Sequence, residues 1–293
     1  MKYVEKHPMI MIVIGVIGIS LSSIFVKYST APSAVTAAYR LLWTVLLMTP
    51  VVIGKKEVRT ELVHVDRKSL LLSALSGLFL AIHFAVWFES LKHTSVASST
   101  TIVCTEVIWV SLGFCLFMKG KLSKKAVATI AVAFVGSALI ACADASMSEA
   151  HLYGDILALI AAVAVAVYML IGRAVRKGVS TTVYTYMVYV VCAATLLIMC
   201  LVQGQGMFDY GISAVIVGLL LAIFSTILGH SIFSWCLKFF SPSFVSASKL
   251  CEPVVAAVFA GFLFNELPKL LQVIGGVLII GAVFYYSRIE KNE

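Results

Sequence analysis

Apolar stretches of about 20 residues recur along nearly the whole sequence, and they constrain the fold more than any other feature. Each stretch is long enough to cross the ~30 Å hydrocarbon core of a bilayer as an α-helix. A spanning segment has to satisfy its own backbone hydrogen bonds, so only helices and closed barrels cross lipid. The sequence lacks the long alternating segments that a barrel needs. We therefore expect an all-α integral membrane protein.

The composition agrees with a chain that lies mostly in lipid. It is 61% hydrophobic and 12% charged, and its mean hydropathy is +1.04, whereas soluble domains are roughly half apolar and a quarter charged. We predict ten transmembrane helices. They cover residues 9–28, 34–53, 69–91, 95–118, 124–143, 154–173, 181–202, 212–237, 241–264 and 268–287. The linkers are short and carry most of the charge, so we expect no appended soluble domain.

The basic residues indicate how the chain is oriented. The formal charge of +8 could suggest a nucleic-acid partner, but most Lys and Arg residues fall in alternate linkers. With a cytoplasmic amino terminus, the inner segments hold Lys2, Lys6, Lys55, Lys56, Arg59, Arg67, Lys68, Lys119, Lys121, Lys124, Lys125, Arg173, Arg176, Lys177, Lys238, Arg288 and Lys291. The outer segments hold Lys27, Lys92 and Lys269. This positive-inside asymmetry places both termini in the cytoplasm and explains the charge without nucleic acid.

The chain also repeats itself. Leu91 and Lys92 match Leu237 and Lys238, a displacement of 146 residues. The same displacement, without gaps, superposes Ser95 on Ser241, Glu106 on Glu252, Lys27 on Arg173, Thr36 on Thr182 and Trp87 on Phe233. Apolar matches can arise by chance, but charged matches inside spans are not expected to. We predict two five-helix repeats, 1–146 and 147–293. An odd number of spans per half inverts the second repeat, an arrangement typical of alternating-access carriers.

Two glutamates at equivalent depth are the strongest candidates for a site. Glu106 and Glu252 lie in the fourth and ninth spans, where a carboxylate costs several kcal/mol. Pro253 lacks an N–H and leaves the carbonyl of Lys249 without its helical partner, which predicts a kink with exposed polar groups. Lys249 precedes Glu252 by three residues, so the two can pair within one helix. We interpret this group as substrate-anchoring or proton-coupling, with Glu106 facing it; the alternative is a structural salt bridge.

Two histidines and a tryptophan are further candidates for a cavity wall. His83 and Trp87 are four residues apart in the third span and present their rings to the same space. His83 could titrate near physiological pH and couple proton movement, or donate a hydrogen bond to substrate. His230 in the eighth span is similar. The alternative is an interhelical hydrogen bond worth about 1 kcal/mol or less.

The remaining polar and aromatic candidates are less distinctive. Trp109 and Tyr168 lie inside spans and could stack on a substrate, although most aromatic residues in such chains pack or mark the membrane interface. Arg40 lies near enough to the outer end of the second span for its guanidinium to reach water, so we favour no cavity role for it. All seven cysteines fall within apolar spans without CxxC spacing. We interpret them as packing residues and expect no metal site.

Three segments carry a family resemblance. Residues 81–100 (AIHFAVWFESLKHTSVASST), 228–242 (LGHSIFSWCLKFFSP) and 249–266 (KLCEPVVAAVFAGFLFNE) resemble the EamA family of the drug/metabolite transporter superfamily. The resemblance extends over the whole chain and implies a bacterial inner-membrane carrier with a central cavity between its halves, often an exporter of amino acids or related metabolites. Family members commonly have a proline in the fourth span that matches Pro253. Here Val107 occupies that position, so we expect the first half to be less bent.

We predict a secondary transporter, most simply an exporter, that moves a small metabolite such as an amino acid across the cytoplasmic membrane by alternating access. A multidrug or cation efflux carrier of the same fold is the alternative, and a passive channel is the next. The sequence has no HExxH, nucleophile elbow or Walker loop, so we expect neither an enzyme nor an ATP-driven pump. We expect no cofactor and no ATPase subunit. The expected partners are the substrate and the bilayer, and the chain is expected to be a monomer or a homodimer.

Overall fold

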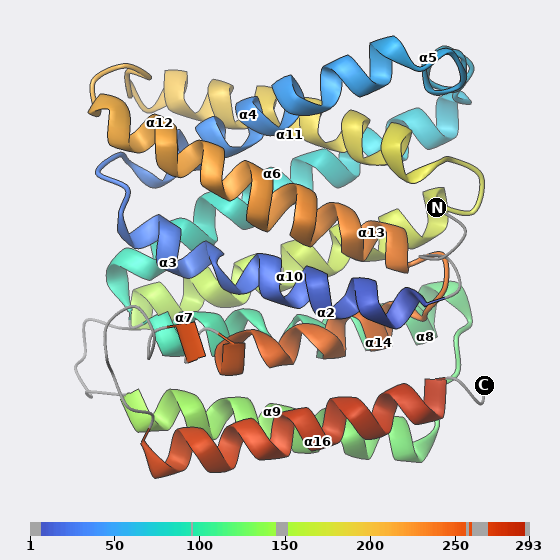
Figure 1. Cartoon of the computed structure of the whole chain (residues 1–293), viewed down its shortest axis with the longest axis vertical. Coiled ribbons are helices and arrows are strands. Elements are labelled where there is room, and N and C mark those ends of the chain that lie inside the picture. Colours follow the sequence, from blue (N-terminus) through green and yellow to red (C-terminus); the bar gives the residue numbers. More distant parts are fainter. Residues whose placement is uncertain (1–6, 95, 145–151, 256–257, 260–268, 291–293) are drawn as a thin grey trace.

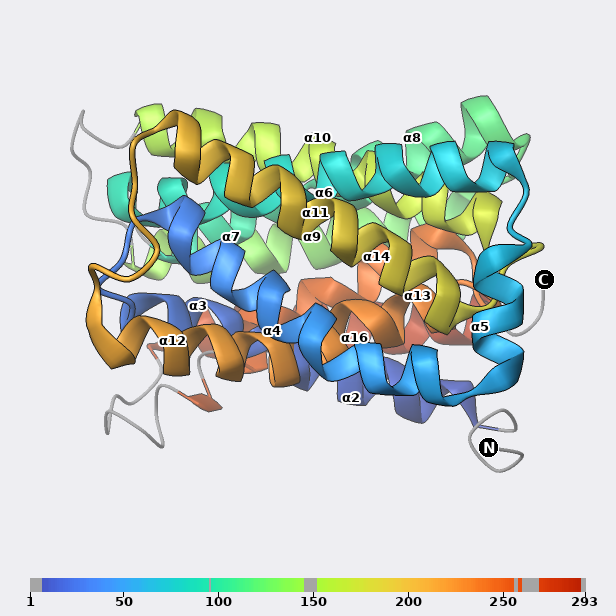
Figure 2. The same cartoon turned by 90° about the horizontal axis from the view of Figure 1, so that it is seen from above.

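The computed structural model describes residues 7–94, 96–144, 152–255, 258–259 and 269–290. Within these ranges every regular element is a helix and no strand occurs. The long helices lie side by side along one common direction (Figure 1 and Figure 2). Eight helical segments are long and apolar enough to cross a membrane. The all-helical membrane architecture predicted from the apolar stretches is confirmed at this level.

The helices follow the predicted spans with ends shifted by a few residues. The first half contains α2 (Pro8–Ser20), α3 (Ser22–Lys27), α4 (Ser33–Gly54), α5 (Lys56–Val63), α6 (Arg67–His93), α7 (Val96–Val103), α8 (Glu106–Met118) and α9 (Lys124–Asp144). The second half contains α10 (Leu152–Val175), α11 (Thr181–Val202), α12 (Gly211–Leu220), the π-helix η2 (Leu221–Ser231), α13 (Ile232–Cys236), α14 (Pro242–Ser248), the 3₁₀ turn η3 (Lys249–Cys251) and α16 (Leu270–Glu290).

Several details differ from the prediction or lie beyond its test. The sequence analysis missed α5, a short helix in the linker after the second span, and the break at Leu21 between α2 and α3. The fifth predicted span is the 21-residue helix α9. The far end of the ninth span, Ser95, Pro268 and the predicted division between residues 146 and 147 lie outside the described residues. The count of ten spans therefore stays a prediction.

The helices repeat with the same displacement as the sequence. Helix α16 begins and ends 146 residues after α9. Helices α2 and α10, which open the two halves, run in opposite directions along the bundle (Figure 1). Contacts repeat as well, because α6 packs on α10 while its counterpart η2 packs on α2. The two halves thus have corresponding helices in inverted orientation.

Basic segments gather at one end of the bundle. Helix α5, the α8–α9 connection and the α10–α11 connection all lie at the end where α2 begins and α16 ends (Figure 1). These three segments carry Lys56, Arg59, Lys119, Lys121, Arg176 and Lys177. The predicted orientation requires this clustering, since inner loops collect positive charge. The cytoplasmic placement of that end stays a prediction.

A glycine allows α2 to lie directly on the π-helix. A Cβ atom on Gly18 would stand 2.6 Å from the carbonyl oxygen of Phe224 and 2.9 Å from that of Leu228. Both of those atoms belong to the backbone of η2, which cannot move aside as a flexible side chain can. Small residues permit this close approach of helices in lipid. The contact fixes the position of η2, which carries one wall of the cavity described next.

Candidate functional site

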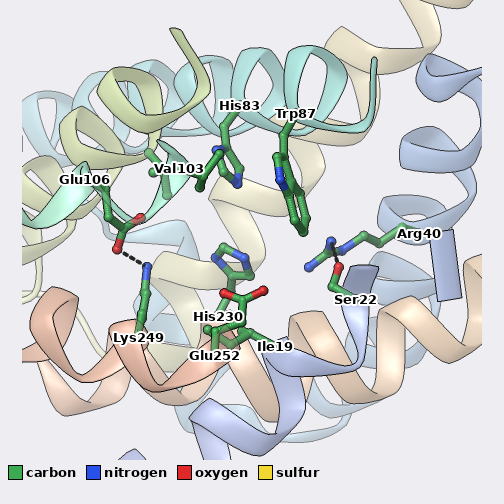
Figure 3. Close-up of a pocket in the computed structure, with 11 residues that line it drawn as sticks. Ile19, Ser22, Arg40, His83, Trp87, Val103, Glu106, His230, Lys249 and Glu252 are labelled. Atoms are coloured by element: carbon green, nitrogen blue, oxygen red, sulfur yellow. Dashed lines mark hydrogen bonds and ion pairs between the residues drawn. The ribbon is translucent and has the colours of Figure 1, made fainter. Parts of the chain in front are cut away.

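A small cavity lies between the two halves. It is lined by Ile19, Ser22, Arg40, His83, Trp87, Val103, Glu106, Val165, His230, Lys249 and Glu252. These residues come from both repeats and include four charged side chains that are each at least nine-tenths buried. In Figure 3, Glu106 and Lys249 stand on one side of the cavity and Arg40 with Ser22 on the other. The cavity is therefore polar at both ends.

The helices of the fourth and ninth spans are interrupted where they reach this cavity. In the ninth span, α14 ends at Ser248, the 3₁₀ turn η3 follows, and helix resumes at Glu252. The predicted irregularity at Pro253 is therefore present. The carbonyl of Lys249 does have a hydrogen-bond donor, however, because the tighter turn lets it accept from the Glu252 amide. The thiol of Cys104 also lies 4.0 Å from that carbonyl oxygen.

The fourth span breaks at the equivalent place without a proline. Helix α7 ends at Val103, a turn covers residues 104–105, and α8 begins at Glu106. The Thr105 hydroxyl donates to the carbonyl of Ile102 at 2.7 Å, which satisfies one backbone group in the turn. Both spans are therefore interrupted at equivalent places, the first half by a turn with Thr105 and the second by the 3₁₀ turn before Pro253. The expectation of a less bent first half stays a prediction.

Lys249 pairs across the two halves rather than within its own helix. Its Nζ atom lies 2.8 Å from Oε1 of Glu106, and both side chains are buried. Nζ also lies 3.3 Å from the Met169 sulfur and 5.4 Å from the Phe233 ring centre. The Lys249–Glu252 pair that the spacing suggested is not formed. Tertiary packing of α14 against α8 brings Lys249 to Glu106, and helical spacing alone does not decide the partner.

Glu252 points into the cavity without a partner. Its side chain is 9% exposed, and among the described residues it forms no hydrogen bond or ion pair. In Figure 3 its carboxylate lies between the Lys249 side and the Arg40 side of the cavity, next to His230. A buried carboxylate of this kind is costly unless something pairs with it. The arrangement leaves Glu252 available to a cationic group that enters the cavity.

Arg40 is a wall of the cavity, which corrects the expectation that it reaches outer water. Its side chain is 1% exposed. Nε donates to the Thr226 hydroxyl at 2.7 Å and Nη1 to the Ser22 hydroxyl at 3.3 Å, while the guanidinium lies 4.0 Å from the Phe84 ring centre. Nη2 has no hydrogen-bond partner in the part of the chain that the structure describes. Arg40 is the eighth residue of α4, so its backbone lies about 10 Å along the helix from the first residue. At this depth the side chain stays buried instead of reaching the water at that end.

The π-helix places two polar residues at the cavity. The Thr226 hydroxyl donates to the carbonyl of Leu221, five residues earlier, at 3.2 Å, and it accepts from Arg40. His230 follows one turn later and lines the cavity. π-Helical segments are uncommon and often occur at functional sites. Nothing in the apolar pattern of residues 221–231 distinguishes this segment from an ordinary helix.

His83 and Trp87 meet as their spacing predicts. Their rings are stacked, with centres 5.8 Å apart. The His83 Nδ1 atom lies 3.0 Å from the Ala161 carbonyl oxygen, which fixes that nitrogen as the donor and leaves Nε2 as an acceptor. The indole Nε1 of Trp87 is buried and meets no hydrogen-bond partner among the residues described. The pair offers the cavity a flat aromatic surface with one open hydrogen-bond donor.

Two predicted contact residues are placed elsewhere. Trp109 is 38% exposed and lies on the outer side of α8, opposite the buried Val107 and Val110. Tyr168 is buried one layer behind the cavity, where its hydroxyl pairs with Ser234 at 2.8 Å and its ring faces His230. The residues after Glu106 in α8 are almost all apolar, so their pattern did not show which face Trp109 occupies. We no longer expect Trp109 to touch substrate.

The comparisons with known proteins agree with the geometry. The sequence model of the EamA-like transporter family matches residues 7–142 and again residues 152–288. The chain belongs to the EamA-like transporter family. The predicted division between residues 146 and 147 falls between the two matches of this family.

Similar proteins of other organisms are distant in sequence but match most of the chain. The uncharacterized transporter YxxF of Bacillus subtilis is 24% identical over 96% of this chain and 88% of its own length. An uncharacterized transporter of Clostridium kluyveri is 24% identical over 94% of each chain, and one of Archaeoglobus fulgidus is 24% identical over 72% of this chain and 73% of its own. A solved crystal structure with 15% identity superposes with a TM-score of 0.78 over 98% of both chains, which supports the fold. This EamA-like chain is a membrane transporter.

Proposed function

We propose that this chain is a secondary carrier that exports a small zwitterionic metabolite, such as an amino acid, across the bacterial cytoplasmic membrane by alternating access. Both termini are cytoplasmic and ten helices span the bilayer in this proposal. The inverted halves with a cavity between them support the mechanism, because such repeats can rock about a central site. The proposal needs no ATPase subunit and no cofactor.

One observation carries the choice of substrate class. The cavity holds one guanidinium with an open nitrogen, Arg40, and one carboxylate without a partner, Glu252. The other two charges, Glu106 and Lys249, neutralise each other. A substrate with a carboxylate and an ammonium can satisfy both open groups at once, because charge-assisted hydrogen bonds are among the stronger ones in proteins. A purely cationic drug would leave the Arg40 nitrogen unmet and add like charge beside it.

The aromatic wall adds a second support. The stacked His83 and Trp87 rings can pack against an apolar side chain, and the open Trp87 Nε1 can donate to a carboxylate held by Arg40. Glu106, Glu252 and His83 stay the candidate residues for proton coupling. His230 stands beside Glu252 and borders the same space (Figure 3).

Transport in proteoliposomes tests the proposal. A thermal-shift screen of amino acids first selects a ligand. Its uptake is then compared with that of its amide, which lacks the carboxylate, and its N-acetyl derivative, which lacks the ammonium. We expect saturable counterflow for the amino acid and at least about tenfold weaker competition from both derivatives, since each loses one charged contact. Flux that rises linearly with concentration would favour a channel, and preference for the amide would favour the cation carrier.

Two variants link the result to the cavity. Arg40→Gln is expected to weaken competition by the carboxylate-bearing ligand while leaving competition by the amide nearly unchanged. Glu252→Gln is expected to weaken competition by the ligands that carry the ammonium, while competition by the N-acetyl derivative stays unaffected. Trp109→Phe on the outer face is the matched control. If both cavity variants discriminate among the three ligands as the unmodified protein does, the assigned contacts are wrong.

A further inference from the structure

Two carboxylates, one from each repeat, stand near a single lysine. Glu106 and Glu252 are equivalent under the 146-residue displacement, whereas the position equivalent to Lys249 is Val103. Lys249 is bound to Glu106 at 2.8 Å, and Glu252 has no partner among the described residues. The repeat therefore supplies two carboxylates and one ammonium. This imbalance has no explanation in packing, since an aliphatic residue would fill either helix at lower cost.

The local geometry lets the same ammonium reach either carboxylate. Lys249 opens the 3₁₀ turn η3 and Glu252 follows three residues later. Side chains at positions i and i+3 of a 3₁₀ turn eclipse each other, so the two lie on the same side of the segment. The remaining close neighbours of the Lys249 ammonium, the Met169 sulfur and the Phe233 ring, are neutral and do not hold it as an ion pair would.

We propose that Lys249 is a tethered counter-cation that exchanges between Glu106 and Glu252 as the carrier alternates. The inference rests on the proposed function, and it couples the position of the Lys249 ammonium to the alternation of the carrier. An inverted repeat that rocks between two states exchanges the surroundings of its equivalent positions. The carboxylate that holds Lys249 in one state is thus the open one in the other. The substrate ammonium occupies whichever carboxylate Lys249 has left, so the empty cavity never exposes two unneutralised carboxylates.

A consequence is that Lys249 reduces the charge that an empty carrier has to compensate. An uncompensated buried charge is costly. Lys249 neutralises one carboxylate at a time, and the Arg40 guanidinium in the same cavity balances the charge of the other. Replacing Lys249 by methionine, which has similar length and no charge, should open the site to a small monovalent cation or a proton.

Thermal unfolding of the purified protein in detergent tests this without substrate. The probe is NaCl at constant ionic strength, with N-methyl-D-glucamine chloride as the replacement, and a parallel series lowers the pH from 8 to 5.5. We expect Lys249→Met to be stabilised by Na⁺ or by acid. Whichever series, NaCl or pH, raises its unfolding temperature identifies the ion that binds. The unmodified protein, in which only Glu252 is open, should respond less than Lys249→Met, because His83 and His230, which line the same cavity, are present in both proteins.

Matched variants make the test specific. Lys249→Arg keeps the charge and is expected to respond to Na⁺ as weakly as the unmodified protein, and Lys238→Met makes the same chemical change on an exposed residue. Lys249→Gln is measured alongside Lys249→Met, so the outcome does not depend on the folding of one variant. Adding Glu106→Gln to Lys249→Met leaves one carboxylate and should reduce the response.

Flux provides the second readout. Transport by Lys249→Met should depend on Na⁺ or on a pH gradient about tenfold more strongly than transport by the unmodified protein, an ordinary coupling between sites. The inference is overturned if Lys249→Met responds to neither ion in unfolding, or if the unmodified protein is stabilised by Na⁺ as strongly as the variant. A failure of amino acid transport with a positive unfolding result would reject the proposed substrate and keep the role of Lys249.

Discussion

The contact between α2 and the π-helix predicts a large effect from a single methyl group. In Gly18→Ala the new Cβ would lie 2.6 Å from the Phe224 oxygen, 2.9 Å from the Leu228 oxygen and 3.0 Å from the Leu228 carbonyl carbon. Ordinary contact begins at about 3.4 Å, and all three atoms belong to backbone, so the two helices have to move apart. Overpacking of this kind typically costs about 1–3 kcal/mol.

A matched glycine separates this steric cost from the general effect of alanine. Gly281 on α16 has no atom within 4 Å of the position its Cβ would take. Alanine is favoured over glycine inside helices by roughly 1 kcal/mol, so Gly281→Ala should be neutral or stabilising. Gly18→Ala gains the same helical preference and still loses stability. We expect the two variants to differ by about 2 kcal/mol in the free energy of unfolding.

Chemical denaturation in mixed detergent and lipid micelles, followed by circular dichroism and extrapolated linearly to zero denaturant, measures this difference. Gly18→Ala should also weaken ligand binding, since the displaced π-helix carries Thr226, which holds Arg40. A Gly18→Ala protein as stable as Gly281→Ala would refute the reasoning. It would mean that η2 does not pack on α2 in the way described.

Two further predictions test single side chains. Trp87→Phe removes the open indole donor of the cavity and should raise KM by roughly 2–10-fold, while Trp109→Phe on the outer face should leave it unchanged; equal effects in a concentration series would contradict the placement of the two rings. Hydrogen bonds from Ser69 hold the pKa of the Asp66 carboxyl below its ordinary value of 3.8. A lowered folded-state pKa stabilises the fold above the unfolded pKa, and the gain is lost as pH falls through the folded value. The stability difference between the unmodified protein and Asp66→Asn should therefore shrink below about pH 4, and a difference that does not vary with pH would exclude this role.

The helices of this protein could be predicted because lipid imposes one rule on the whole chain. A spanning segment must be apolar, about 20 residues long and hydrogen-bonded within itself. Helix α11 accordingly has the predicted ends, Thr181 and Val202. The breaks at Leu21 and at residues 104–105 were not predicted, since local turns inside an apolar stretch leave little trace in hydropathy.

The candidate site was predictable in part, because polar groups inside a bilayer carry a free-energy cost. Polar residues within spans, namely Glu106, Lys249, Glu252 and His83, were therefore recognisable in the sequence as candidates. Arg40 is also a charged residue within a span. Its distance from the helix end was misjudged, so its side chain was assigned to the outer water instead of the cavity. Depth along the helix was the available signal: the eighth residue of a span is already about 10 Å inside it.

The sequence alone determined the helical membrane fold, the two repeats and the equivalence of Glu106 with Glu252, because hydropathy, charge and a constant displacement are properties of the chain itself. Only the tertiary structure decided which carboxylate Lys249 binds, which groups the Arg40 guanidinium contacts, and which way Trp109 faces. In lipid, every face of a spanning helix can be apolar, so sequence periodicity does not record which side meets a neighbour. The packing of distant segments provides that information, and the chemistry of the cavity depends on it.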